Sequence, residues 1–244
     1  MSSTINDRTV TVIVPCYNEA SRLDLDRFEE LLDRPNLALL FVDDGSTDGT
    51  AALIADWSAS HERAELLRLP RNVGKGEAIR AGMIDSVGSA DIVAYLDADL
   101  ASPPGELLRV LDVIDQDDSI DFAMGSRVAL LGSNIERSRL RHYQGRIFAT
   151  IASVVLGLPV YDTQCGLKVI RSTPALDAAV ATPFRSRWVF DVELIARMMR
   201  APIPLRADAI REVPLAEWRD VGGSRLSVSA RMRSVYDLVT AIRH

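Results

Sequence analysis

Apolar and polar positions alternate in two different periods through the first half of the chain. Short aliphatic and β-branched runs predict strands at residues 9–14, 37–42, 65–69 and 92–96. The intervening segments predict helices, at residues 22–33, 48–58, 75–86 and 104–115. Strands that are separated by single helices pair in parallel through right-handed crossovers. The pattern therefore predicts an α/β fold with a mostly parallel central sheet flanked by helices on both faces.

The second half of the chain is less regular. Its apolar runs predict strands at residues 122–125, 167–170 and 206–213, and helices at residues 138–156 and 190–200. A last amphipathic helix is predicted at residues 226–242. Because no repeat, low-complexity tract or linker interrupts the pattern, we interpret residues 1–244 as a single domain.

The composition excludes several classes of protein. The longest apolar stretch, residues 147–160, is shorter than the ~18 residues that a membrane-spanning helix needs. Residues 1–8 are polar, which argues against a secretory signal peptide. Two cysteines, Cys16 and Cys165, make no disulfide scaffold, and the three histidines form no metal-ligand pattern. These features favour a reducing, cytoplasmic compartment.

Charge divides the chain in two. Residues 1–121 contain 10 basic and 24 acidic side chains, whereas residues 122–244 contain 18 and 10. An acidic half joined to a basic half suggests two chemical tasks, although the division could also be without consequence. The overall net charge is −6, and we expect no nucleic-acid partner.

The most informative segment is Asp97-Ala98-Asp99, directly after the predicted strand at residues 92–96. Two acids separated by one small residue can hold a hard divalent cation, especially when phosphate oxygens complete its ligand shell. In an extended chain, alternation would point both carboxylates the same way. The alternative is a solvated turn, which most such pairs form.

Other polar residues follow the first two strands. Asp43 and Asp44 end the second strand, where Asp43 could accept hydrogen bonds from a base or ribose or, alternatively, belong to a turn and helix cap. Pro15 ends the first strand, and Tyr17 offers a ring on which a base can stack, or packs over the sheet edge. Lys75 begins a predicted helix and could assist a phosphate or ribose.

Ordered motifs run through the whole chain and resemble one family. These are IVPCYNEA (13–20), FVDDGSTDGT (41–50), RNVGKGEAIRAGM (71–83), YLDADLASPPGEL (95–107), MGSR (124–127), YDTQCGLKVIR (161–171), RWVFDVELI (187–195), EVPLAEW (212–218) and GGSRLS (222–227). Together they resemble the family 2 inverting glycosyltransferases of GT-A fold. Within that family they are most similar to the polyprenyl-phosphate glycosyltransferases of the dolichyl-phosphate β-glucosyltransferase subgroup.

The resemblance implies a nucleotide-sugar donor and Mg²⁺ or Mn²⁺. It assigns residues 9–121 to the donor and metal and residues 122–244 to the acceptor. Its donor motifs map onto Pro15, Tyr17, Glu19, Asp43, Lys75, Asp97, Ala98 and Asp99, with Asp97 and Asp99 as metal ligands. Related mannosyl enzymes carry a glutamine where this chain has Ala101, so water and the diphosphate would supply more of the ligand shell. The N-terminal membrane anchor of eukaryotic relatives is absent from this sequence.

Anionic reactants need cations, and arginines gather in the second half. We assign Arg127, Arg139 and Arg225 to the acceptor phosphate or the diphosphate, with Arg137 and Arg141 as competitors. A solvated helix face is the alternative for any one of them. Asp162 and Gln164 are assigned to the sugar or acceptor, and Trp188 to the hexose face or the core. Asp191 is assigned to orienting the sugar, or to a general base if the acceptor needs one.

These assignments predict that the enzyme transfers a hexose to a polyprenyl phosphate at a membrane surface, with inversion. The expected donor is UDP-glucose. Residues 147–160 and 226–242 would pack mainly in the core and touch lipid with an exposed minority. The alternatives are a family 2 enzyme that uses GDP-mannose or a UDP-amino sugar with a hydroxyl acceptor, and an inactive nucleotide-sugar binding protein. A sugar-phosphate nucleotidyltransferase is disfavoured because no glycine-rich loop follows the first strand. The sequence does not indicate an oligomeric state.

Overall fold

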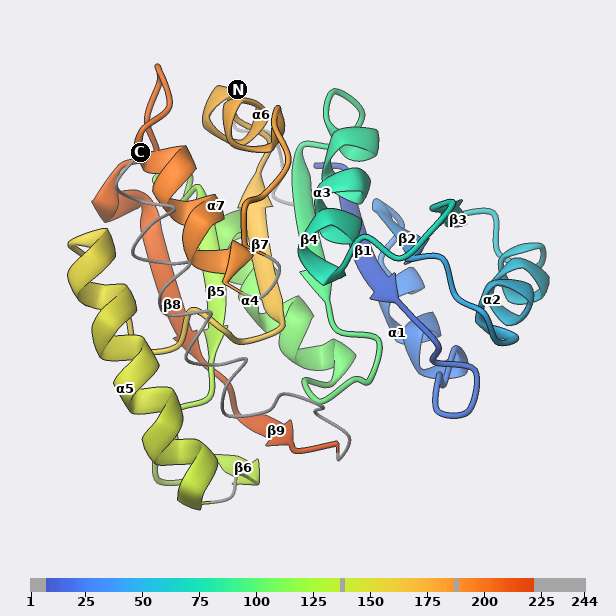
Figure 1. Ribbon diagram of the computed structural model, residues 1–244, viewed down its shortest axis with the longest axis horizontal. Helices are drawn as coiled ribbons and strands as arrows, with labels where there is room; N and C mark the ends of the chain where they lie inside the picture. The colour runs from blue at the N-terminus through green and yellow to red at the C-terminus, as the bar shows by residue number, and fades with distance from the viewer. Residues whose placement is uncertain (1–7, 137–138, 187–188, 222–244) are drawn as a thin grey trace.

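A seven-stranded mixed sheet runs through the middle of the computed structural model, which describes residues 8–136, 139–186 and 189–221 (Figure 1). Its strand order is β3-β2-β1-β4-β7-β5-β8. The strands are β1 (Val10–Cys16), β2 (Leu37–Asp43), β3 (Ala64–Arg68), β4 (Ile92–Leu96), β5 (Phe122–Ser126), β7 (Leu167–Arg171) and β8 (Ile210–Pro214). Strands β1 to β4 are parallel, and β5 and β8 are parallel to each other. Between these two groups, β7 pairs antiparallel with both β4 and β5.

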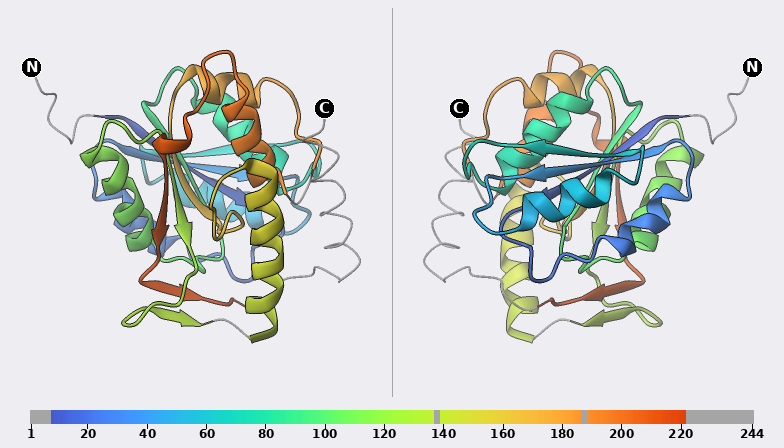
Figure 2. Two further views of the ribbon diagram at one scale, coloured as in Figure 1. Left: turned by 90° about the vertical axis from the view of Figure 1, so that its left-hand side faces the viewer. Right: turned by 90° about the vertical axis from the view of Figure 1, so that its right-hand side faces the viewer.

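Helices cover both faces of this sheet (Figure 2). One face packs against α1 (Glu29–Leu32), α2 (Thr50–Ser58) and α4 (Pro104–Gln116). The other packs against α3 (Lys75–Ser86), α5 (Arg139–Leu156), α6 (Pro174–Val180) and α7 (Phe190–Met199). Two 3₁₀ turns, Asp26–Phe28 and Ala207–Ala209, precede α1 and β8. The predicted layers and the mostly parallel sheet are confirmed.

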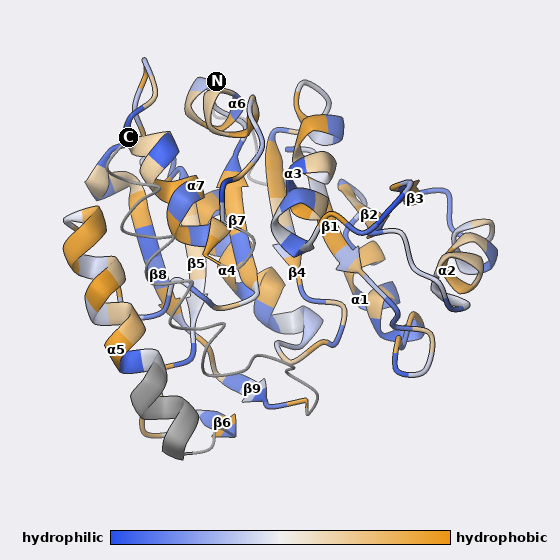
Figure 3. Ribbon diagram, in the orientation of Figure 1, coloured by the Kyte–Doolittle hydropathy of each residue, from blue (hydrophilic) through white to orange (hydrophobic). Residues whose placement is uncertain are grey.

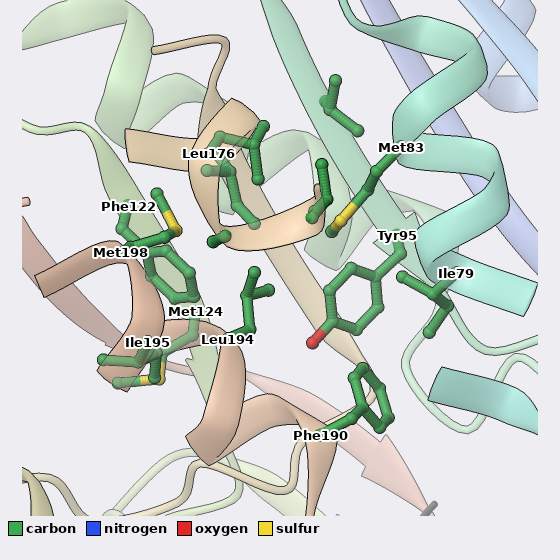
Figure 4. Close-up of a cluster of buried hydrophobic side chains, with 14 of the residues drawn as sticks. Ile79, Met83, Tyr95, Phe122, Met124, Leu176, Phe190, Leu194, Ile195 and Met198 are labelled. Atoms are coloured by element: carbon green, nitrogen blue, oxygen red, sulfur yellow. The ribbon is translucent and has the colours of Figure 1, made fainter. Parts of the chain in front are cut away.

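The central strands β1, β2 and β4 are almost entirely apolar because both faces of the sheet are covered there. Along β1, Val12 and Val14 join the core under α4, while Ile13 joins the core under α3. Tyr95 of β4 lies in the core under α3, with α3 on one side and the Phe190 ring of α7 on another (Figure 4). Colouring by hydropathy shows that apolar residues are concentrated in the central strands, whereas many polar segments lie around the rim (Figure 3).

Several elements differ from the sequence prediction. The helix predicted at residues 22–33 is reduced to one 3₁₀ turn and the short α1. The helix predicted at residues 48–58 begins two residues later, at Thr50, with Gly49 at its N-cap. The small parallel sheet of β6 (Asn134–Glu136) and β9 (Glu217–Arg219) and the helix α6 were not predicted. Three-residue strands are too short to give a period-2 signal.

The segments considered for membrane contact are only partly described. On α5, the Ile147 and Val154 side chains are exposed, whereas Ala149, Ala152 and Leu156 are buried in the core. The helix predicted at residues 226–242 lies outside the described residues. Across the part of the chain that the structure describes, no helix combines the length and apolarity needed to cross a membrane.

Candidate active site at the carboxyl edge of the sheet

Polar residues from both halves of the chain meet at one edge of the sheet. The parallel strands β1, β2, β4 and β5 all end there, and the antiparallel β7 begins there. A hydrogen bond of 2.8 Å from the Asp44 amide to the Cys16 carbonyl joins the ends of β1 and β2. Ligands of open α/β sheets bind beyond the carboxyl ends of the strands. This edge is therefore the candidate site.

Asp97 and Asp99 form a tight turn at the end of β4. The Leu100 amide donates to the Asp97 carbonyl at 3.1 Å, and Leu100 has a φ of +50°. The expected extended backbone is therefore wrong here, since a turn, and not strand alternation, sets the positions of the two carboxylates. Burial, and then the charge of Asp97, raises the pKa of Asp99 above its ordinary value. The two carboxylates thus lie close enough to repel each other.

Lys75 faces this pair from the first residue of α3. Its ammonium Nζ lies 2.5 Å from Asp97 Oδ1. Desolvation lowers the pKa of Lys75, but the charges of Asp97, Asp191 and Asp99 together leave that pKa raised. The helix start is fixed by Asp44, whose carboxylate accepts from the Val73 and Gly74 amides at 2.7 and 2.9 Å. Asp44 thus connects β2 to the loop that delivers Lys75.

The loop after β1 carries Tyr17, Glu19 and Arg22. The Tyr17 side chain is 44% exposed, so its ring is open to a ligand. The Glu19 amide donates to Thr50 Oγ1 at 2.8 Å, and its carboxylate Oε1 accepts from Arg22 Nη2 at 2.6 Å. That hydrogen bond is the main cause that raises the pKa of Arg22, with smaller contributions from the charges of Asp99 and Asp97. Arg22 therefore brings a second cation into the field of the aspartate pair.

Asp43 is completely buried at the end of β2. Its Oδ1 accepts from the Ser46 amide at 3.2 Å, and its Oδ2 lies 3.6 Å from Arg68 Nε. Among the described residues, Oδ2 accepts no hydrogen bond. An orphaned acceptor of this kind suits a ligand N–H or O–H group. Pro15 is half-buried one strand away, in register with Val42.

At the end of β5, Arg127 makes a bidentate ion pair with Asp162. The Nε–Oδ2 and Nη2–Oδ1 distances are 2.6 and 2.7 Å. Desolvation lowers the pKa of Arg127, but the Asp162 carboxylate outweighs it and holds that pKa above the ordinary value. The guanidinium also lies 5.4 Å from the centre of the Trp218 ring. Two of its five N–H groups are thus directed at Asp162.

Asp191, in the first turn of α7, accepts three side-chain donors. Lys168 Nζ lies 2.8 Å from Oδ1, the Tyr95 hydroxyl also donates to Oδ1, and Gln164 Nε2 donates to Oδ2 at 3.2 Å. Lys168 is completely buried and Asp191 is 6% exposed. The carboxylate therefore fixes Gln164 and α7 against the sheet edge, an arrangement that suits positioning better than proton abstraction.

Other predicted site residues are placed less fully. Ala98 is buried between the two aspartates, where it has no polar side chain to contribute. Arg139 begins α5, but its side chain lies outside the described residues. Arg137, Trp188 and Arg225 lie wholly outside them. The roles assigned to these residues stay predictions.

Four side chains of this edge were missed as site residues in the sequence. Tyr95 and Lys168 lie inside apolar strands and were taken as core positions. A lysine within the run Leu167–Arg171 is the signal that could have identified one of them, because lysine is almost never fully buried unless paired. Asp44 was noted as an acid at a strand end but given no role, and Arg22 carried no pattern that separates it from surface charges.

The donor set fits a hard divalent cation. Asp97 Oδ1 is buried, and its neighbour at 2.5 Å is the Lys75 ammonium. Carboxylate oxygens are the ligands that Mg²⁺ and Mn²⁺ prefer. The described part of the chain has no cluster of three or more acidic, histidine or cysteine ligands. The protein thus offers Asp97 and Asp99, and a bound diphosphate and water would complete the shell.

Gly166 sets the position of Asp97, which gives a testable prediction. The Asp97 amide donates to the Gly166 carbonyl at 3.1 Å, and a Cβ on Gly166 would lie 2.1 Å from Asp97 Oδ2. We expect Gly166→Ala to displace the carboxylate and to lower kcat/KM by about 100-fold, the usual scale for a misplacement of ~1 Å. Gly105→Ala is the control, because its Cβ would meet only the flexible Glu30 side chain at 3.3 Å. Equal activity of both variants would contradict this role.

Comparison with known proteins identifies the family. The model of glycosyl transferase family 2 matches residues 11–176. A dolichyl-phosphate beta-glucosyltransferase of Trichomonas vaginalis is 31% identical over 242 residues, covering 94% of this chain and 69% of the relative. The Drosophila melanogaster dolichyl-phosphate beta-glucosyltransferase is 32% identical, covering 89% and 69%. An undecaprenyl-phosphate 4-deoxy-4-formamido-L-arabinose transferase of Sodalis glossinidius is 30% identical, covering 96% and 67%.

Solved structures share the fold. Glucosyl-3-phosphoglycerate synthase of Mycobacterium tuberculosis, in complex with Mn²⁺ and UDP-glucose, has a TM-score of 0.70 at 20% identity, covering 97% of this chain and 78% of that one. The fold is that of a GT-A glycosyltransferase. The chain belongs to glycosyltransferase family 2, and it is a glycosyltransferase.

Proposed function

We propose that this enzyme transfers glucose from UDP-glucose to a polyprenyl phosphate with inversion at the anomeric carbon. The observation that carries the proposal is the arrangement of Asp97, Asp99 and Lys75 at the sheet edge, with Arg127 directly after β5 in the electrostatic field of Asp97. Relatives at about 30% identity that are named as dolichyl-phosphate glucosyltransferases support the choice of sugar and acceptor. We propose Tyr17 and Asp43 as nucleoside contacts, with Pro15 and Glu19 shaping their loop.

Breaking the bond between sugar and diphosphate requires stabilisation of the charge on the departing diphosphate. When bound, Mg²⁺ or Mn²⁺ acts as a Lewis acid at the diphosphate, held by Asp97 and Asp99. Lys75 and Arg22 add fixed positive charge on the protein side. Because these cations are positioned before the reaction, they need no reorganisation in the transition state.

The acceptor determines whether a base is needed. A phosphate oxygen is already anionic at neutral pH, so it can attack the sugar without losing a proton to the protein. We propose that Arg127 and the arginines of residues 137–146 and 225 hold this anion, while Gln164, fixed by Asp191, contacts the sugar. Three donors around Asp191 are consistent with a positioning carboxylate.

We further propose that residues 9–121 form the donor half and residues 122–244 the acceptor half. Acceptors of this kind reside in a bilayer, so the enzyme would work peripherally at a membrane surface. The two free, buried cysteines are consistent with a reducing compartment, which supports our proposal that this surface is the cytoplasmic face.

The direct test is incubation of the purified protein with UDP-glucose, Mg²⁺ or Mn²⁺ and a short-chain, water-soluble polyprenyl phosphate. We expect a β-linked glucosyl phosphate of the polyprenol, identified by mass spectrometry and by NMR of the anomeric proton. Turnover of GDP-mannose or a UDP-amino sugar in place of UDP-glucose would overturn the donor assignment. Binding of UDP without transfer or hydrolysis would point to an inactive binding protein.

An acceptor hydroxyl is the second candidate, and it makes a different demand on the same residues. Attack by a neutral hydroxyl needs a general base, which contributes typically 10²–10⁴-fold to the rate. Under that alternative, Asp191→Asn or Asp162→Asn would lower the rate of transfer to a soluble alcohol at least 100-fold. Under the lipid-phosphate proposal, no soluble alcohol is turned over.

The pH dependence of donor binding follows from Asp99. Burial and the neighbouring Asp97 raise the pKa of Asp99 above the ordinary 3.8, and only the deprotonated carboxyl can ligate a cation. As the pH falls through that raised pKa, Mn²⁺-dependent affinity for UDP-glucose should fall, at a higher pH than for an ordinary aspartate. Calorimetric titrations with and without Mn²⁺ from pH 7.5 to 4.5 measure the effect. An Mn²⁺ contribution that stays constant over this range would contradict it.

A further inference from the structure

A leucine pair projects from a tight turn between β5 and β6. Leu131 is fully exposed, at 107% of its reference area, and the Leu130 side chain is 53% exposed. The turn is hydrogen-bonded, with the Ser133 amide donating to the Leu130 carbonyl at 3.1 Å and the Leu130 amide donating to Ser133 Oγ at 3.0 Å. Gly132 has a φ of +89°, which allows this tight reversal. The fold thus presents two large aliphatic side chains to solvent on an ordered turn.

The surroundings of the leucine turn, Leu130–Ser133, favour an anionic apolar partner. From residue 122 to residue 135 the sequence contains no acidic side chain, and residues 126–146 contain five arginines and one acid. Val128 and Ala129 extend the apolar run on the side of the turn toward β5. An exposed leucine pair within an arginine-rich segment that contains few acids has the composition of an interfacial membrane contact.

The leucine turn is connected to the candidate site on both sides. Arg127 lies three residues before Leu130, at the end of β5. On the other side, β6 pairs with β9, where Ile135 is in register with Trp218, whose ring lies beside the Arg127 guanidinium. The segment that contains the turn lies at the end of the molecule toward which β5 and β8 run, as both orientations show (Figures 1 and 2). A bilayer against the turn would therefore lie on the acceptor side of the sheet edge.

We infer that the leucine turn docks the enzyme on a lipid bilayer by inserting Leu130 and Leu131, so that the sheet edge with the candidate site lies beside the membrane surface. This inference rests on the proposed function only for the acceptor; the membrane contact itself is a separate property. The turn is distinct from residues 147–160 and 226–242, to which the sequence alone directed attention. The hydrogen bonds of the turn hold the two leucines in exposed positions in the free enzyme. Binding to a membrane therefore costs little conformational entropy in this segment.

The test compares vesicle binding with catalysis. Vesicles of phosphatidylcholine with phosphatidylglycerol are sedimented with wild type, Leu131→Ser and Leu130→Ser/Leu131→Ser. We expect the single variant to lower the partition coefficient about tenfold and the double variant about 30-fold or more, because each leucine loses apolar burial. Ile203→Ser is the matched control, since Ile203 is 64% exposed and lies after α7, away from the leucine turn. Its partition should be unchanged.

Activity then separates docking from chemistry. With polyprenyl phosphate in vesicles, the double variant should lose at least tenfold in rate, whereas with the water-soluble short-chain acceptor it should match wild type. Failure of wild type to bind vesicles, or unchanged binding by the double variant, would overturn the inference. So would a wild-type dimer that the substitutions convert to monomer, since the leucines would then contact a second copy. Vesicle binding without transfer to either acceptor would instead contradict the proposed function and leave the docking intact.

Discussion

Replacing Asp97 or Asp99 by asparagine lowers the rate of sugar transfer about 10³-fold in our account. Each substitution removes one of two carboxylates that would hold the cation at the departing diphosphate. Lewis-acid stabilisation of that charge contributes several kcal/mol, and each 1.4 kcal/mol corresponds to a factor of ten in rate. Single-turnover rates with saturating UDP-glucose and Mn²⁺ measure the loss without interference from product release.

The control for these variants is Asp56→Asn on the exposed side of α2. It makes the same chemical change away from the sheet edge and should leave the rate within twofold of wild type. Thermal unfolding checks that the Asp97 and Asp99 variants are folded. If they are folded and retain more than a tenth of the wild-type rate, the aspartate pair is not the metal site.

The second large effect concerns stability. Lys168→Met leaves Asp191 buried without its ammonium partner, which lies 2.8 Å away in the native protein. Removing one partner of a buried ion pair costs about 3–5 kcal/mol in the free energy of unfolding, because the remaining charge is uncompensated. Urea denaturation should show a lower midpoint with an unchanged slope.

Two further variants show whether the pair is the cause. Lys168→Met combined with Asp191→Asn removes both charges, so it should be more stable than Lys168→Met alone. Arg206→Met breaks an ion pair with Asp208 in which both side chains are more than 60% exposed, and it should cost less than about 1 kcal/mol. If Lys168→Met is no more damaging than Arg206→Met, the buried network does not fix this part of the site.

The sequence was sufficient for the layers of the fold because the central strands of a covered sheet are almost entirely apolar. Residues 37–42 and 92–96 differ from the observed β2 and β4 by at most one residue. The antiparallel direction of β7 could not be read in the same way, since direction depends on the connection and not on side-chain period. The reduced α1 shows that amphipathic spacing also occurs in segments that only partly form a helix.

The candidate site was predictable where residues follow strands and unpredictable where they act through a partner. Asp97, Asp99 and Asp43 stand at strand ends, which places them at one edge in any parallel sheet. By contrast, the Arg127–Asp162 pair joins residues 35 positions apart, and Asp191 meets Tyr95 across 96 positions. Such long-range contacts leave no local signal in one sequence, so the direct engagement of Arg127 by Asp162 emerged only from the structure.

The most direct test of the whole account is a crystal structure with UDP-glucose and Mn²⁺, with anomalous scattering used to locate the metal. The account predicts one strong Mn²⁺ peak within 2.5 Å of carboxylate oxygens of Asp97 or Asp99, bridging to the diphosphate, a separation typical of metal–oxygen ligation. It also predicts the uracil beside Tyr17. A diphosphate bound elsewhere, or a metal that contacts neither aspartate, would contradict it.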